Sequence, residues 1–120
     1  MKLPNKVANL TDLAEFLKTL EYDAYNTKDN KFNMREQVYC IGGWAKRLQP
    51  VSSLSIVEAV KKLAPTVHLE EIAKLCFRPY NDNFDGWAAT PQQAAKAVEI
   101  LRDTGKCDWE KAMKEEELAL

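Results

Sequence analysis

Cys40 is the residue of this 120-residue chain whose type and position could support nucleophilic chemistry. It lies near the start of a helix predicted over 39–48, and the amide dipoles at a helix N-terminus stabilise a thiolate. The lone histidine, His68, could act as its base if the fold brings the two side chains together. Cysteine is also among the residues most often buried as a small hydrophobe. A cysteine-dependent enzyme using Cys40 and His68 is therefore an alternative function, and buried packing of Cys40 is the favoured interpretation.

Two glycines follow this cysteine, in the stretch Cys40-Ile41-Gly42-Gly43-Trp44-Ala45. Glycine in a helix costs about 1 kcal/mol relative to alanine, so a pair marks a close approach of another part of the chain. We expect this seam to pack against a helix predicted over 91–104, whose inner stripe is rich in alanine. The predicted structural motif consists of Cys40, Gly42, Gly43, Trp44 and Ala45.

Metal and cofactor chemistry have little support in the sequence. Zinc could be bound by side-chain atoms of Cys40, His68, Cys76 and Cys107. These residues lack the paired local spacing that is typical of a zinc site. The loop between Asp82 and Asp85 lacks the regular acidic series and the later glutamate of a calcium loop. No Gly-rich phosphate loop or dinucleotide fingerprint is present. We expect no metal and no cofactor.

The charge balance and the cysteine usage restrict the class of protein. The chain has 17 Lys and Arg against 18 Asp and Glu, whereas proteins that bind polyanions normally carry a basic surplus. No apolar run approaches the roughly 20 residues that cross a bilayer, and the N-terminus lacks the apolar region of a secretory signal. Three widely separated cysteines are typical of free thiols in a reducing compartment. We expect a cytoplasmic protein without a membrane partner.

Apolar periodicity predicts an all-α fold, a compact single-domain bundle of five or six short helices. No segment alternates with the period of two that is typical of a strand. Residues 1–10 are expected to form a flexible N-terminal arm, and residues 11–120 a single helical domain. The expected helix caps or first residues are Thr11, Tyr39, Ser52 or Ser53, Leu69, Thr90 and Asp108. In the fourth of these helices, we expect one inward face, formed by Leu69, Ile72, Ala73 and Cys76.

The clearest of these helices follows Thr90, which is a good N-cap residue. Pro91 occupies the first helical position and Gln93 completes a capping box. Gly105 is a natural C-terminal stop. These signals predict a helix over 91–104.

A binding function is the main prediction from the sequence. Trp87 lies in a polar loop, with Arg78 and Tyr80 nearby, and these residue types dominate the energy of protein interfaces. Lys61 and Lys62 add a locally positive surface. We therefore predict a non-catalytic protein that binds another macromolecule through these five residues, with a protein as its partner.

DNA binding is a second alternative, because residues 55–77 read as two short helices joined by a brief connection. Such a pair resembles a helix-turn-helix unit. Its second helix carries Glu70 and Glu71 at the N-terminal end, where a recognition helix would meet phosphates. This arrangement argues against a nucleic-acid partner.

Several short motifs, in this order, resemble a family of small uncharacterised proteins of phages and bacteria. They are Phe32-Asn33-Met34, Cys40-Ile41-Gly42-Gly43-Trp44-Ala45, and Gly105-Lys106-Cys107-Asp108-Trp109. The family pattern is F-[DN]-M, C-[IV]-[AG]-G-[WHY]-A and G-x-x-D-W. The resemblance covers about residues 10–109. The chain departs from the pattern in carrying Gly42 where alanine is common, and Cys76 and Cys107 at less usual places. The resemblance implies a phage or prophage context, with a host protein as the partner, and no catalytic mechanism.

Overall fold

The computed structural model describes residues 7–22, 31–32, 34, 40–49, 55–81 and 84–119. This part of the chain forms six α-helices, and the predicted all-α class is confirmed. The helices are α1 (Leu10–Leu17), α2 (Ile41–Arg47), α3 (Ile56–Leu63), α4 (Leu69–Phe77), α5 (Pro91–Thr104) and α6 (Trp109–Ala119). A short 3-10 helix, η1 (Gly86–Ala88), precedes α5.

Two pairs of two-residue strands were not predicted. β1 (Glu21–Tyr22) pairs in parallel with β2 (Lys31–Phe32), and β3 (Tyr80–Asn81) pairs antiparallel with β4 (Phe84–Asp85). Strands of this length contain too few residues to show an alternating pattern in a sequence. The β3–β4 hairpin falls in the region where the sequence predicted a polar loop around Trp87.

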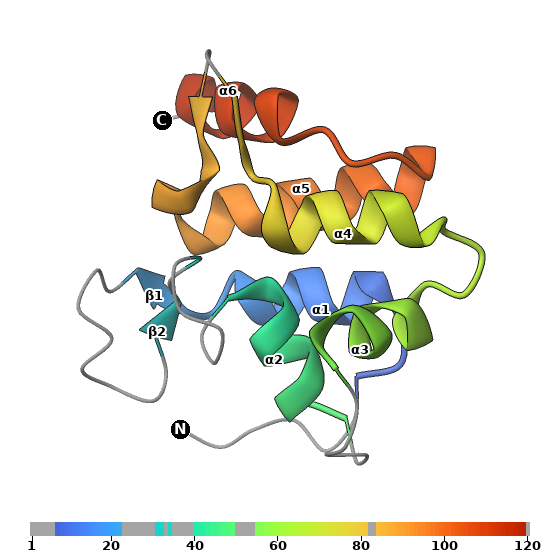
Figure 1. The fold of residues 1–120 in the computed structure, drawn as a ribbon. Coiled ribbons are helices and arrows are strands. Elements are labelled where there is room, and N and C mark those ends of the chain that lie inside the picture. The colour runs from blue at the N-terminus through green and yellow to red at the C-terminus, as the bar shows by residue number, and fades with distance from the viewer. Residues whose placement is uncertain are drawn as a thin grey trace.

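The six helices form two layers, with α1, α2 and α3 in one layer and α4, α5 and α6 in the other (Figure 1). Across the layers α1 packs against α5, and α3 packs against α4. Within the layers α2 packs against α3, and α6 packs against α5. The hairpin lies at the C-terminal end of α4, where the chain turns toward η1 and α5 (Figure 1).

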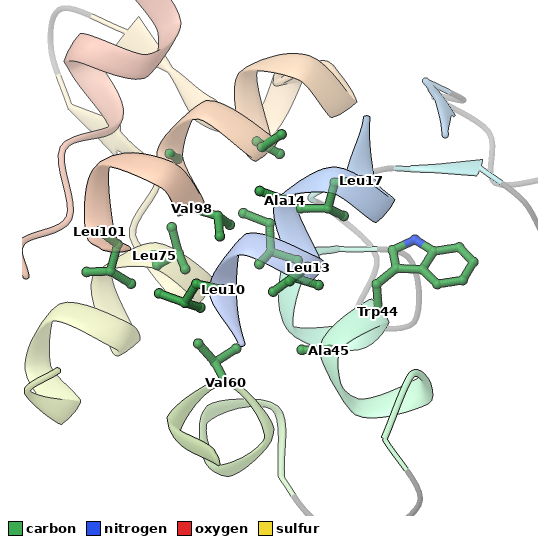
Figure 2. Packing of buried hydrophobic residues seen from close by; sticks show 14 of the residues in the cluster. Leu10, Leu13, Ala14, Leu17, Trp44, Ala45, Val60, Leu75, Val98 and Leu101 are labelled. Atoms are coloured by element: carbon green, nitrogen blue, oxygen red, sulfur yellow. The ribbon is translucent and has the colours of Figure 1, made fainter. Parts of the chain in front are cut away.

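Helix α1 is central to the hydrophobic core. Five of its eight residues are buried, and Leu13, Ala14 and Leu17 are inaccessible to solvent. Figure 2 shows the side chains of α1 between those of α5, such as Val98, and those of α3, such as Val60. On another side of α1, the Phe16 ring lies 5.2 Å from the Trp44 ring.

The glycine seam does bring two helices together, but its neighbour is α3. A Cβ atom added at Gly42 would lie 1.7 Å from Cγ2 of Ile56, so α3 fills the space that a side chain would need. The prediction that the seam packs against helix 91–104 is therefore corrected. α5 packs instead on α1 and α6, and α2 packs on the helix that follows it in the chain.

The predicted caps of α5 and α6 are confirmed. The Gln93 amide donates to the Thr90 hydroxyl over 3.1 Å, and the Thr90 amide donates to the Gln93 side chain over 2.9 Å. Gly105 ends α5 in the left-handed conformation, with φ 74°. Asp108 accepts a 3.0 Å hydrogen bond from the Lys111 amide at the start of α6.

The residues predicted to cap α1 and α3 are not those that cap these helices in the structure. α1 is capped by Asn9, whose side chain accepts from the Asp12 amide over 2.9 Å, and Thr11 lies inside the helix. α3 is capped by Ser55, which forms a capping box with Glu58. The predicted caps Ser52 and Ser53, and the predicted helix start Tyr39, fall outside the described residues.

The boundary drawn at residue 10 does not match the packing. Of the predicted N-terminal arm, residues 7–10 are described, and Val7 and Leu10 are buried in the core. Burial of these two apolar side chains stabilises the folded state, and a flexible arm in water would not provide this stabilisation. The helical domain therefore includes at least these residues.

One residue of the predicted inner face of α4 is also exposed. Ile72 and Cys76 are buried as expected, together with Leu75. Leu69, in the first turn of α4, borders an open hollow and is 57% exposed.

Gly42→Ala tests the close approach of α2 and α3. The added Cβ would overlap Ile56, and overpacking of a core typically costs about 1–3 kcal/mol. We expect a loss of this size in the free energy of unfolding, measured by urea denaturation. Ile56→Ala removes Cγ2, so the double variant should lose less stability than the sum of the two single variants. Strict additivity would show that Ile56 does not limit the space at Gly42.

Candidate functional site

A group of exposed aromatic and cationic side chains gathers where α4 passes into the β3–β4 hairpin. Tyr80 is 57% exposed and Phe77 is 45% exposed, although both are large apolar side chains. Arg78, between them in the chain, is also exposed. Phe84 and Trp87 are half-buried. We call these five residues, Phe77, Arg78, Tyr80, Phe84 and Trp87, the α4–hairpin face.

The hairpin is held against the end of α4 by a glycine. The Gly86 amide donates to the Pro79 carbonyl, and a Cβ added at Gly86 would lie 2.1 Å from that oxygen. Pro79 itself is fully buried. This contact requires that the residue after β4 has no side chain. It holds the start of η1 beside Pro79, the residue that precedes β3.

The same turn stacks two aromatic rings. The Asp85 carboxylate accepts a 3.0 Å hydrogen bond from the Trp87 amide, which fixes the start of η1. The Trp87 ring then lies 6.0 Å from the Tyr80 ring, with 27° between their planes. Tyr80 is thus supported from behind while most of its surface is exposed.

Beside Tyr80 lies an open hollow of about 220 Å³. It is lined by Lys74, Arg78, Tyr80, Phe84, Cys107, Asp108, Trp109 and Glu110. The hollow therefore combines apolar rings with charges of both signs, a composition that suits recognition of a polypeptide better than that of an apolar small molecule.

Most charges of this hollow are already used within the protein. The Lys74 ammonium lies 3.0 Å from a Glu71 oxygen, and Glu110 is paired with Lys114 at 3.4 Å. Asp108 caps α6, as described above. Arg78 differs, because its guanidinium makes no hydrogen bond or ion pair with any residue that the structure describes.

Glu71 joins α4 to the connection between α5 and α6, which forms one wall of the hollow. Its second oxygen accepts a 2.9 Å hydrogen bond from the Cys107 amide. The Cys107 amide and the Lys74 ammonium hold the pKa of Glu71 below its usual value. Nearby, the Trp109 indole donates to the Leu75 carbonyl over 3.1 Å in a buried hydrogen bond. These two contacts fix the start of α6 on α4.

The candidate nucleophile Cys40 is in a different environment. It is only 4% exposed, and its sulfur accepts a 3.4 Å hydrogen bond from the Gly43 amide as the N-cap of α2. Burial raises the pKa of the Cys40 thiol despite this contact. His68 is exposed, and it makes no hydrogen bond with Cys40. The structure thus buries the proposed nucleophile and leaves the proposed base in solvent.

The two other thiols are similarly unsuited to nucleophilic chemistry. Burial, with a smaller effect of Cys40 and Cys107, raises the pKa of Cys76 far above its usual value. Burial and the neighbouring Glu71 raise the pKa of Cys107 to about 12. The described residues contain no group of three or more His, Cys, Asp or Glu side chains that could hold a metal ion.

His68 lines a second open hollow, of about 590 Å³, at the start of α4. Its other lining residues are Lys61, Leu69, Glu70, Glu71, Gly105 and Lys106. The carboxylates of Glu70 and Glu71 lie in the first turn of α4, where they would repel a phosphate group. This charge arrangement also weighs against the helix-turn-helix interpretation of residues 55–77.

The two lysines predicted as binding residues have different surroundings. The Lys61 ammonium donates to the Pro65 carbonyl over 2.8 Å and to the Val67 carbonyl over 2.6 Å. It thereby ties the end of α3 to the connection before α4. Lys62 is exposed on α3. The structure does not place Lys61 within the α4–hairpin face, and its charge already has a structural use.

Phe77 and Phe84 were not among the predicted site residues. Phe77 lies five residues after Ile72, about 140° around the helix, and so outside the buried stripe of α4. That offset is a signal that the sequence does carry. Phe84 becomes part of the face only through the hairpin, which apolar periodicity could not predict.

No protein-family model, curated protein or solved structure matches this chain. Within the described ranges, none of the helices has the length and apolarity needed to cross a bilayer.

Burial predicts slow thiol chemistry. In the folded protein at neutral pH, iodoacetamide should modify Cys40 and Cys76 at least tenfold more slowly than in urea, because their thiolates are disfavoured and shielded. Cys107, which is half-buried, should be the first to react. Mass spectrometry of labelled peptides measures each rate. Rapid, selective labelling of Cys40 would instead support the cysteine-enzyme alternative.

The lowered pKa of Glu71 predicts a dependence of stability on pH. The ionised carboxylate stabilises the folded state fully above its unfolded pKa, near 4.5, and this contribution is lost as the pH falls through the lower folded value. Glu71→Gln should cost about 1 kcal/mol in the free energy of unfolding at pH 7 and progressively less in acid. Urea denaturation from pH 7 to pH 3 measures the difference. A cost independent of pH would contradict the assignment, and Glu70→Gln is the matched control.

Proposed function

We propose that this protein acts by binding another protein through the α4–hairpin face, without catalysis. The observation that supports this most directly is Tyr80, a large aromatic side chain that is mostly exposed and stacked on Trp87. Tyrosine, tryptophan and arginine supply most of the binding energy at protein interfaces. An aromatic pair held in place before binding also loses little side-chain entropy when a partner covers it.

The arrangement of the surrounding residues supports the same interpretation. Phe77 adds a second exposed apolar side chain on the same segment, and Arg78 lies between Phe77 and Tyr80 in the sequence. An interface typically combines such an apolar centre with charged groups at its edge. Asp108 and Glu110 at the start of α6 provide those edge charges.

The proposed partner is a protein of the cell in which this chain acts, in the cytoplasm. Three free cysteines are consistent with a reducing compartment. The resemblance to the phage and bacterial pattern is the reason to expect a host protein in particular.

Tyr80→Ala tests the proposed face. Immobilised wild-type protein and the variant are compared in quantitative capture from a bacterial lysate, and any captured protein is then purified for direct affinity measurement. Removal of a central tyrosine typically costs about 2 kcal/mol or more, so we expect at least a tenfold weaker affinity.

Lys62→Glu tests the other predicted binding surface, because Lys62 is exposed on α3. Circular dichroism should show the same helical content for all three proteins, since neither residue is buried. A partner bound equally by wild type and Tyr80→Ala, but lost with Lys62→Glu, would place the interface on α3 instead.

A further inference from the structure

We infer that the α4–hairpin face recognises an acidic peptide segment, in which a carboxylate pairs with Arg78 and an adjacent apolar side chain covers Tyr80. This inference rests on the proposed function and specifies the chemistry of the partner. It follows from the charges that remain available on the face.

Arg78 is the cation of the hollow that is available to a ligand. The other cation of the hollow, Lys74, already lies beside two carboxylates, at 3.0 Å from Glu71 and 4.0 Å from Glu70. Arg78 has no such neighbour among the described residues. Its planar guanidinium can bind a carboxylate through two parallel hydrogen bonds. The hollow therefore offers an incoming anion a cation that is not already neutralised.

The acidic residues of the hollow differ from Arg78 in this respect. Glu110 is paired with Lys114, and Asp108 accepts the Lys111 amide at the N-terminus of α6. Both carboxylates thus have partners within the protein. A partner cation would have to compete with these contacts, whereas a partner carboxylate at Arg78 would not.

The charges of the hollow suit a peptide better than a nucleic acid. The hollow offers a single available arginine, whereas a chain of phosphates normally binds to several cations at once. A peptide with one carboxylate needs only one cation, and Arg78 provides it. The exposed Tyr80 ring lies two residues away and borders the same hollow, so an apolar side chain next to the carboxylate can contact it.

The test uses peptides as probes, selected from a random dodecapeptide library displayed on phage against the full-length wild-type protein. The enriched peptides are synthesised with a fluorescent label, and their affinities are measured by anisotropy. We expect Asp or Glu next to a large apolar residue. Arg78→Gln should weaken binding about tenfold, as for the loss of a charge-assisted hydrogen-bonded pair.

A charge exchange is the decisive arm of this test. Arg78→Glu should abolish binding of the acidic peptide, and replacing the peptide's acid with lysine should restore it. Arg47→Glu is the control for a general effect of charge, because Arg47 is exposed on α2, away from the α4–hairpin face. Thermal unfolding of each variant verifies the fold, and Arg78→Gln keeps the test valid if Arg78→Glu is unstable.

The outcomes separate this inference from the proposed function. Peptides that need Tyr80 but are indifferent to Arg78 would overturn the inference and leave the face as the binding site. Peptides that bind Tyr80→Ala as well as wild type, or no enrichment at all, would count against the face itself. Arg78-dependent binding of a labelled single-stranded oligonucleotide would also overturn the inference, since it would identify a nucleic acid as the ligand.

Discussion

The contact between Gly42 and Ile56 is the constraint on which the arrangement of the helices depends. The Ile56 side chain occupies the space where a Cβ at Gly42 would be, and Cys76 of α4 lies 3.5 Å from the same point. Three helices, α2, α3 and α4, therefore meet at a residue without a side chain. Interiors are packed so densely that a single added methyl group must displace its neighbours. The position of α4, and of the face at its end, follows from how closely α3 can approach α2.

The same dense packing explains why Cys40 is a structural residue. A thiol at a helix N-terminus is stabilised as a thiolate only if solvent or a cation can reach it. Cys40 has the helix position but is buried, and its desolvation outweighs the amide contacts in their effect on the pKa. Its sulfur serves instead as an acceptor for the Gly43 amide. The two features that suggested a nucleophile, a thiol and a helix start, are thus both present, and burial decides between the interpretations.

The parts of the fold that could be predicted are those whose signals are local. Helix α5 is the clearest example. The capping box of Thr90 and Gln93 begins it and Gly105 ends it, through hydrogen bonds that span three or four residues, and Pro91 occupies its first position. The glycine seam predicted a close approach but not its partner, because a missing side chain does not indicate which helix will fill the space. Asn9, and not Thr11, caps α1. These two polar residues flank Leu10 and offer equivalent signals, and the burial of Leu10 selects between them.

The candidate site was predictable in its residue types and not in its geometry. Trp87, Tyr80 and Arg78 were singled out as interface residues from their chemistry, whereas their proximity depends on Gly86, which lets η1 return to Pro79. A hairpin of two-residue strands shows no periodicity in the sequence. The need for a glycine at position 86 is the sequence feature that reflects it. Lys61 shows the opposite case, in which an apparently free surface charge is used to hold two backbone carbonyls. An exposed charge therefore indicates an interface only if it has no partner within the protein. Among the cations of the hollow, Arg78 meets this condition within the described residues.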